Sequence, residues 1–215
     1  VKVEVRRDNG SKTDVGEKGI IFTAGPQVML GYYKNKEATD KVLGKDGWLN
    51  TGDIGIKTEN GEIVIVGRAK DTIVLMGGEN VEPEPIEDKM KEGLYIDHAA
   101  LLGQDRKQLT ALIAVNEDEL MNLAGELKVA DYEIKTEGEN SIEHDRIYTI
   151  LMKEVSSLIS KEQGFKSFER ISKILAVRNN FSIGKELTQT MKVKRKYIID
   201  KYQSLIERLH GDTRN

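Results

Sequence analysis

The first 69 residues alternate short apolar runs with glycine-containing turns, a pattern that is typical of β structure. The turn signals are Asp8-Asn9-Gly10, Asp46-Gly47 and Asn60-Gly61. On either side of the last turn, isoleucines stand two residues apart, as the strands of a hairpin require: Ile54 and Ile56 before it, Ile63 and Ile65 after it. We therefore predict a β-rich segment with a hairpin centred on Asn60-Gly61.

From residue 70 onward, strand-like and helical spacings follow one another. Residues 72–75 indicate a strand, and residues 83–93 indicate a helix that two prolines open and a glycine closes. Two further apolar stretches, 98–103 and 109–115, predict a pair of strands joined by a polar turn. We therefore expect this part of the chain to be an α+β domain.

Two later segments, residues 147–159 and 197–209, carry apolar positions at helical spacing. Both predict amphipathic helices. The charged stretch 128–140 shows neither the helical spacing nor the strand alternation of apolar residues, so we expect a surface loop there. The change of pattern places a boundary between a first part, residues 1–69, and a second part, residues 70–215.

Composition narrows the classes of function. The 33 lysines and arginines face 36 aspartates and glutamates, and the resulting formal charge of −3 gives no bulk positive field for nucleic acid or an anionic membrane. The absence of cysteine excludes disulfides, thiolate nucleophiles and cysteine metal sites. A hydrophobic content of 38% and a mean hydropathy of −0.47 fit a soluble globular protein.

The chain opens at Val1 with strand-like alternation and without methionine, from which we expect a segment cut out of a larger protein. No apolar run approaches the ~18 residues of a membrane-spanning helix, and no signal peptide opens the chain. We expect a cytoplasmic location. A peripheral contact with the inner face of a membrane stays open.

Five short motifs are individually weak but occur in a distinctive order and spacing. They are GPQVMLGYY at 25–33, WLNTGD at 48–53, GRAKD at 67–71, GGENVEP at 77–83 and LTQTMKVKR at 187–195. Together they resemble the carboxy-terminal portion of adenylate-forming (AMP-binding) enzymes. Within that superfamily they are most similar to the long-chain fatty acid–CoA ligases (acyl-CoA synthetases), and the resemblance spans residues 19–209.

This resemblance implies an α+β fold in two parts. Residues 1–69 would be the β-rich end of a large adenylation domain, and residues 70–215 a small mobile lid domain with a helical insertion at about 116–165. The parent enzyme would convert a fatty acid and ATP with Mg²⁺ into acyl-AMP and pass the acyl group to coenzyme A. The phosphate loop and acyl pocket are expected upstream, so the isolated chain should be inactive and hold none of these ligands tightly.

Asp53 follows a Thr-Gly turn, where a carboxylate could cap the turn or accept hydrogen bonds from both hydroxyls of a ribose. The resemblance implies the ribose contact with the nucleotide. Arg68 closes the second arm of the predicted hairpin, and its guanidinium could contact ribose or phosphate oxygens. By the same resemblance Ile65 would pack near the nucleoside. An ordinary hairpin position is the alternative for both Ile65 and Arg68.

Lys70 lies where the two patterns meet, and the resemblance makes it the hinge, which must absorb large backbone rotations. A solvated linker lysine is the alternative. Gly77 and Gly78 permit a tight turn with close backbone approach, and the resemblance places one of them beside the pantetheine path of coenzyme A. The alternative is an ordinary turn with no role in binding. Which of the two glycines would face coenzyme A also stays open.

Lys192 is the candidate catalytic residue. By resemblance its ammonium bridges the acyl carboxylate and the α-phosphate during adenylation, a purely electrostatic role. Gln189 stands where relatives frequently have proline. A second interpretation is a basic helix start that binds nucleic acid or lipid headgroups, formed by Lys192, Lys194, Arg195, Lys196 and Lys201. The negative overall charge and the scarcity of interleaved aromatic residues disfavour it, and no nucleic-acid partner is expected.

Other chemistries find no support in the sequence. It contains neither a Gly-x-x-x-x-Gly-Lys-Ser/Thr phosphate loop nor a Gly-x-Ser-x-Gly elbow, and its three histidines, His98, His144 and His210, are too scattered to suggest a metal site. One different class of function stays open. The chain could be a non-catalytic interaction module that retains the lid fold and contacts a partner through residues 116–165.

Overall fold

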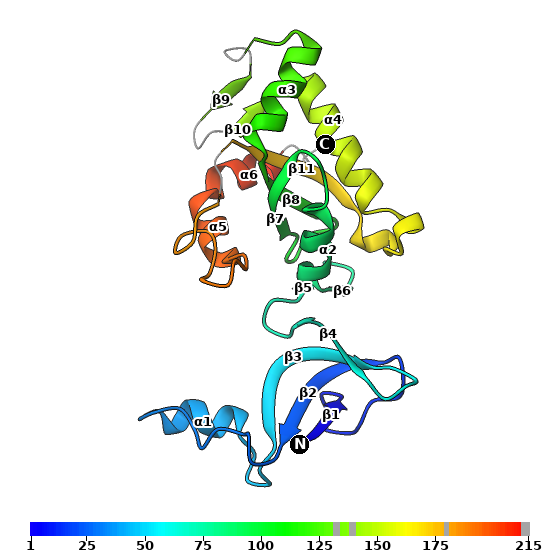
Figure 1. Ribbon diagram of the computed structural model, residues 1–215, viewed down its shortest axis with the longest axis vertical. Helices are drawn as coiled ribbons and strands as arrows, with labels where there is room; N and C mark the ends of the chain where they lie inside the picture. Colours follow the sequence, from blue (N-terminus) through cyan, green and yellow to red (C-terminus); the bar gives the residue numbers. More distant parts are fainter. Residues whose placement is uncertain (131–133, 138–140, 179–180, 212–215) are drawn as a thin grey trace. The chain divides into compact units, whose positions relative to one another are not determined.

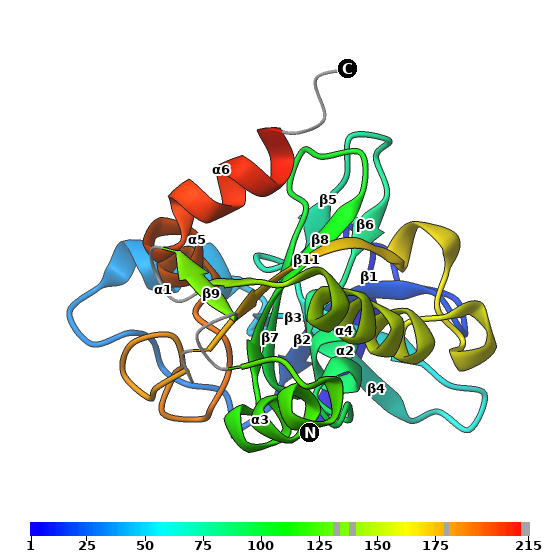
Figure 2. The same ribbon diagram turned by 90° about the horizontal axis from the view of Figure 1, so that it is seen from above.

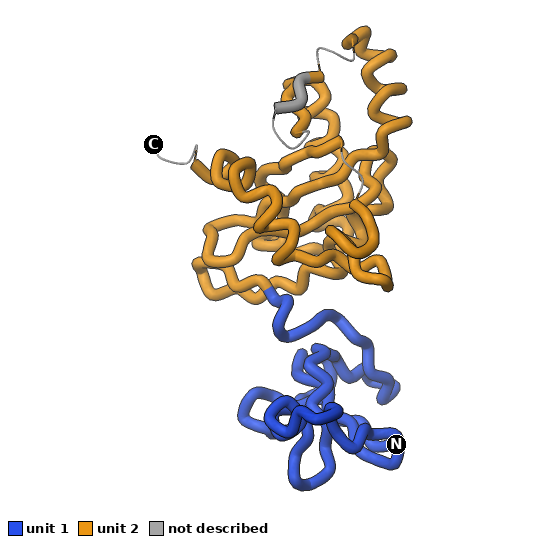
Figure 3. The backbone as a smooth tube through the Cα atoms, turned by 90° about the vertical axis from the view of Figure 1, so that its left-hand side faces the viewer, with its two compact units in different colours: residues 1–72 blue, residues 73–215 orange. Residues whose placement is uncertain are grey.

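A computed structural model of the chain describes residues 1–130, 134–137, 141–178 and 181–211 (Figure 1). Contacts within the chain divide it into two compact units, residues 1–72 and 73–215 (Figure 3). This division falls a few residues after the change of sequence pattern at residue 70. Each unit contains a sheet of its own.

The first unit is built on a four-stranded antiparallel sheet in the order β1-β2-β3-β4. Its elements are β1 (Lys2–Arg6), β2 (Lys18–Ala24), the short helix α1 (Lys36–Val42), β3 (Leu49–Lys57) and β4 (Ile63–Arg68). Strands β3 and β4 pair on either side of Asn60-Gly61, so the predicted hairpin is confirmed. Of the apolar side chains described in this unit, three are buried: Val5, Ile21 and Ile54. The unit therefore has a small core.

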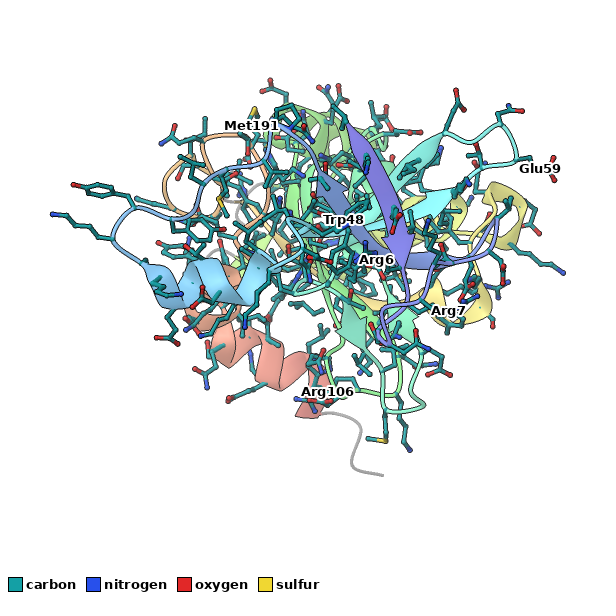
Figure 4. All side chains as sticks on the ribbon, turned by 90° about the horizontal axis from the view of Figure 1, so that it is seen from below. Arg6, Arg7, Trp48, Glu59, Arg106 and Met191 are labelled. Carbon is teal, nitrogen blue, oxygen red and sulfur yellow. The ribbon has the colours of Figure 1, made fainter. Side chains whose placement is uncertain are left out.

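The guanidinium of Arg6 lies over the ring of Trp48 in this unit (Figure 4). The guanidinium carbon of Arg6 lies 4.4 Å from the centroid of the Trp48 ring and 4.7 Å from that of Phe22. Cation–π contacts of this geometry add modest stability to a sheet with few buried side chains. Trp48 is also the only tryptophan of the chain, so its fluorescence reports on the first unit.

The second unit is built on a five-stranded mixed sheet in the order β7-β8-β11-β10-β9. The strands are β7 (Ile96–Leu102), β8 (Leu109–Val115), β9 (Lys135–Glu137), β10 (Ser141–Glu143) and β11 (Ile171–Val177). Strands β7 and β8 form the predicted antiparallel pair, whereas β8 and β11 run parallel. Two short strands, β5 (Ile73–Val74) and β6 (Asn80–Val81), pair with each other separately.

Helices cover both faces of this sheet (Figures 1 and 2). One face carries α2 (Pro83–Met90), α3 (Glu117–Leu127) and α4 (Asp145–Leu158), and the other carries α5 (Arg195–Lys201) and α6 (Gln203–Gly211). Strand β8 is buried along its whole length because its side chains alternate between two cores. Leu109, Ala111 and Ile113 face the first core, Leu112 and Ala114 the second. The α+β expectation is confirmed.

The segment 197–209 differs from its prediction, because the expected single helix is broken at Tyr202 into α5 and α6. Tyr202 is fully buried and shares one core with Ile198 and Leu205. The helical spacing of the apolar residues is therefore real. Backbone hydrogen bonds continue on both sides of the break, because the Tyr202 N–H donates to the Ile198 carbonyl and the Ile206 N–H donates to the Tyr202 carbonyl, each at 2.9 Å.

The segment 128–140 was predicted as a loop, yet it contains β9, which pairs with β10 at the edge of the sheet. Residues 131–133 and 138–140 lie outside the described part. A charged strand of three residues has no apolar alternation that a sequence pattern could reveal. The predicted helical stretch 116–165 consequently holds two strands besides α3 and α4, and the helix predicted for 83–93 ends earlier, at Met90.

Candidate functional site

Asp53 and Arg68 are brought together on neighbouring strands of the first unit. They are paired across β3 and β4, and Arg68 Nε lies 2.9 Å from Asp53 Oδ1. The turn before Asp53 is held by Thr51, whose Oγ1 accepts the Asp53 N–H at 3.1 Å, and by Gly52, whose φ of +73° favours glycine. The Asp53 side chain is 25% exposed and that of Arg68 46%, so a ligand could reach both.

Ile65 and Lys70 are both exposed in the first unit. Ile65 lies in β4 and is 66% exposed, and its neighbour Val64 is 50% exposed, so this strand presents apolar surface. Lys70 lies in the turn after β4, which is closed by a hydrogen bond from the Asp71 N–H to the Arg68 carbonyl at 2.9 Å. This turn immediately precedes the division between the units.

Gly77 and Gly78 form an exposed turn between β5 and β6 of the second unit. The Gly78 N–H donates to the Leu75 carbonyl at 2.9 Å, and Gly78 has a φ of +88°. The two glycines differ in their surroundings. A Cβ added to Gly77 would lie 2.4 Å from Glu79 Oε2, whereas nothing lies within 4 Å of a Cβ added to Gly78.

Lys192 lies at the end of a tight turn whose base is the bridge between Leu187 and Val193. The Thr188 N–H donates to the Lys192 carbonyl at 2.8 Å, and the Lys192 N–H donates to Thr188 Oγ1 at 3.0 Å. The Lys192 side chain is 58% exposed, and its Nζ lies 2.6 Å from Oε1 of Glu84, itself 41% exposed in the first turn of α2. An exposed pair of this kind contributes about 0–1 kcal/mol, so the ammonium can leave it easily.

A buried cluster joins the start of α5 to α2 and β7. Glu87, whose side chain is 8% exposed, accepts hydrogen bonds at 2.6 Å from Arg195 Nη1 and from the Leu101 N–H. Arg195 Nη1 also donates to the Leu101 carbonyl at 2.6 Å. Only two residues separate Lys192 from α5, so this cluster anchors the chain directly after the candidate catalytic residue.

A second buried carboxylate, Glu186, anchors the chain before Lys192. Its Oε1 accepts from Lys201 Nζ at 2.8 Å, and its Oε2 accepts from the Ser182 N–H at 3.0 Å. Burial opposes ionisation of Glu186, but these hydrogen bonds outweigh it and lower the pKa of Glu186 to about 2. The pKa of Lys201 is raised correspondingly, because the bond to Glu186 outweighs its own burial. Both groups therefore remain charged at neutral pH.

Neither Glu87 nor Glu186 was recognised from sequence as a residue that organises the site. A signal existed for Glu87, because it stands beside Ile86 and three residues before Met90 on the buried face of a short helix. A carboxylate at such a position needs a partner. No pattern marks Glu186, which lies in an irregular segment.

Within the described ranges, no group of three or more acidic or histidine side chains could hold a metal ion. Of the three histidines, His98 stacks on Phe181 with ring centroids 5.6 Å apart, which is a packing role. No helix in the part of the chain that the structure covers is long and apolar enough to cross a membrane.

The chain is similar in sequence to a known protein family and to several known proteins. The family described as AMP-binding enzyme C-terminal domain matches residues 70–214. The chain is 36% identical over 218 residues to the probable acyl-activating enzyme 16, chloroplastic, of Arabidopsis thaliana, and 38% identical over 207 residues to the chloroplastic long-chain-fatty-acid–acyl-carrier-protein ligase AEE15 of the same plant. It is 33% identical over 215 residues to the long-chain-fatty-acid–CoA ligase ACSBG2 of Gallus gallus.

These matches cover 96%, 91% and 94% of the chain, but only 29%, 26% and 28% of the respective relatives. The chain thus spans less than a third of the length of these proteins. Among solved structures, the A domain of carboxylic acid reductase from Segniliparus rugosus, in complex with AMP and a co-purified carboxylic acid, matches with a TM-score of 0.80 at 21% identity. That match covers 99% of this chain and 32% of the other.

O-succinylbenzoate coenzyme A synthetase from Bacillus subtilis, in complex with AMP, matches with a TM-score of 0.63 at 19% identity, covering 91% of this chain and 32% of the other. At such identities the two structural matches establish the fold.

Proposed function

Because the chain belongs to the family of AMP-binding enzyme C-terminal domains, we propose that it is the carboxy-terminal part of a long-chain fatty acid–CoA ligase. The parent enzyme would join a fatty acid to ATP, giving acyl-AMP and pyrophosphate, and coenzyme A would then displace AMP to form a thioester. Two relatives, at 38% and 33% identity, are long-chain fatty acid ligases, which supports a fatty acid as substrate. Residues 1–69 would be the end of the adenylation domain and residues 70–215 the lid.

The observation that carries this proposal is the setting of Lys192. Its ammonium stands on a turn that buried ion pairs anchor on both sides, while its own contact, with Glu84, is exposed and weak. A cation held in this way can move from Glu84 to a reacting carboxylate and phosphate without disturbing the fold. There it would stabilise the negative charge that builds up during adenylation.

Asp53, Arg68 and Ile65 would form the nucleotide contacts of the first unit. Arg68 Nε holds one carboxylate oxygen of Asp53, which leaves the other oxygen to accept from the ribose hydroxyls. The exposed Ile65 would pack against the nucleoside. As the resemblance implies, Mg²⁺ would be held by the ATP phosphates and by residues of the parent enzyme outside this chain.

Lys70 and the glycine turn would serve the second half-reaction. Lys70 lies in an exposed turn close to the division of the units, a position that suits a hinge. Gly78 rather than Gly77 would face the pantetheine of coenzyme A. The space beside Gly78 is open, whereas the Glu79 carboxylate covers Gly77.

A half-reaction experiment on the full-length ligase tests the role of Lys192. Lys192→Ala should slow acyl-adenylate formation by about 10²–10³-fold and spare thioester formation from supplied acyl-adenylate, because its charge acts only in the first step. Lys196→Ala is the matched control, since it removes another exposed cation, at the start of α5. Equal loss of both half-reactions in Lys192→Ala would contradict the assignment.

The same assay tests the role of Lys70 as the hinge and the identity of the molecule that accepts the acyl group. Lys70→Pro fixes one backbone rotation and should spare adenylation while it impairs the thioester step. Undiminished turnover in this variant would remove the hinge role. Coenzyme A and a holo-acyl carrier protein are offered in parallel as acceptors, and transfer to the carrier protein alone would refute coenzyme A as the acceptor.

The isolated chain should be inactive and should not bind ATP measurably. A contact between Asp53 and the ribose is worth roughly 1.5–3 kcal/mol, whereas a Kd of 1 mM requires about 4.1 kcal/mol net of association costs. Titration calorimetry of ATP into the 215-residue chain checks this expectation. Submillimolar binding would show that the chain holds a complete nucleotide site.

A further inference from the structure

Two cations at the start of α5, Lys192 and Arg195, both meet carboxylates of α2. Lys192 Nζ lies 2.6 Å from Glu84 Oε1, and Arg195 Nη1 lies 2.6 Å from Glu87 Oε1. The two glutamates stand three residues apart in α2, so they share one face of the helix. The segment that carries Lys192 is therefore joined to α2 at two neighbouring points.

The two ion pairs differ in burial. The side chains of Glu87 and Arg195 are 8% and 19% exposed, whereas those of Glu84 and Lys192 are 41% and 58% exposed. An exposed pair shifts an equilibrium by up to about fivefold, whereas breaking a buried pair leaves a buried charge without a partner. The buried pair therefore fixes the segment on α2, and the exposed pair can open while the fold stays intact.

The backbone of the Lys192 turn is held in place, which leaves movement to the side chain. Two hydrogen bonds join Thr188 and Lys192, one through the Lys192 carbonyl and one through its N–H. The Lys194 N–H donates to the Glu186 carbonyl at 2.7 Å. Rotation about the bonds of the flexible lysine stem can carry the ammonium toward Glu84 or away from it.

Glu84 and Lys192 belong to the same compact unit, residues 73–215. Their contact can therefore form in every orientation that a mobile lid would take. An ammonium that pairs closely with one carboxylate interacts more weakly with an anion farther away, because the attraction falls with distance. Glu84 consequently competes with the reacting carboxylate and phosphate for the charge of Lys192.

We propose that Glu84 is a positioning residue for the adenylation reaction, which holds the ammonium of Lys192 away from the reacting atoms until the substrate anions displace it. The inference rests on the proposed role of Lys192. It adds a competing counter-ion that lowers the rate of the first half-reaction. The acyl carboxylate and the α-phosphate together carry more negative charge than Glu84, so they draw the ammonium across when both are bound.

The test compares the half-reactions of Glu84→Gln and the wild type in the full-length ligase. At low ionic strength and saturating substrates, Glu84→Gln should form acyl-adenylate about two- to fivefold faster, because the competing charge is gone. Thioester formation from supplied acyl-adenylate should not change, since the charge of Lys192 acts only in the first step. Added salt should bring the two adenylation rates together, because it screens an exposed pair.

Asp88→Asn is the matched control. It removes a carboxylate from the same helix, one that pairs with Lys91 at 2.5 Å and is 59% exposed, and it should leave both half-reactions unchanged. Urea unfolding provides the control for folding, because Glu84→Gln should keep the midpoint of the wild type.

A double variant tests whether Glu84 acts through Lys192. Once Lys192→Ala has slowed adenylation, adding Glu84→Gln should have no further effect. An adenylation rate in Glu84→Gln that is unchanged or lower, or an equal gain in both half-reactions, would overturn this inference alone. A normal adenylation rate in Lys192→Ala would instead overturn the proposed role of Lys192, and the inference with it.

Discussion

Two glutamates on the same short helix allow a matched test of burial. Glu84 and Glu87 both lie in α2 and both pair with a cation close to the turn that carries Lys192. The Glu84 side chain is 41% exposed, that of Glu87 8%. We predict that Glu87→Gln strongly destabilises the second unit, whereas Glu84→Gln, the same chemical change, has almost no effect.

The magnitudes follow from the contacts. Glu84→Gln breaks one exposed ion pair, which is worth about 0–1 kcal/mol. Glu87→Gln removes the charge from a carboxylate that accepts two bonds of 2.6 Å, and it leaves the Arg195 guanidinium, 19% exposed, without its counter-charge. Hydrogen bonds to charged groups contribute about 1.5–3 kcal/mol, which sets the expected loss. Arg195→Ala should cost more, about 3–5 kcal/mol, because it leaves Glu87 buried and unpaired.

Urea unfolding followed by far-ultraviolet circular dichroism measures these losses, since the second unit holds most of the helix. Fluorescence of Trp48 supplies an internal control, because that residue lies in the first unit and its transition should not move. The double variant Glu87→Gln with Arg195→Ala, compared with the two single variants, gives the coupling energy of the pair.

Equal destabilisation by Glu84→Gln and Glu87→Gln would refute the reasoning, since it would show that burial does not distinguish the two pairs. A coupling energy near zero would show that the contributions of Glu87 and Arg195 to the free energy of unfolding are independent, which would contradict a stabilising ion pair between them.

Three further predictions concern single residues. Because the pKa of Glu186 is lowered to about 2 in the folded chain, its contribution to the free energy of unfolding is present above about pH 4.5 and is lost as the pH falls toward 2. In Glu186→Gln, the free energy of unfolding should therefore depend less on pH between these values. Gly78→Ala should cost about 1–2 kcal/mol in urea unfolding through its positive φ alone, because its surroundings are open. Asp53→Ala should raise the KM for ATP of the full-length enzyme and leave kcat less affected. Unchanged kinetics would show that Asp53 only caps its turn and does not contact the nucleotide.

Elements with a strong local period were predictable from the sequence. The hairpin at Asn60-Gly61, the β7–β8 pair and the helix α4 all follow from residues within a few positions of one another. Elements without such a period were missed. The strand β9 consists of Lys135–Glu137 and takes its conformation from its pairing with β10.

The sequence by itself determined the order of the motifs, the α+β class and the individual identities of Asp53, Arg68 and Lys192 as candidate site residues. Only the tertiary structure decided their partners. Arg68 pairs with Asp53, and Glu87 meets Arg195 across 108 positions of chain. Such contacts depend on how sheets and helices pack, whereas a sequence pattern records only the spacing of neighbours along one element. The same limit explains why the break at Tyr202 emerges only in three dimensions.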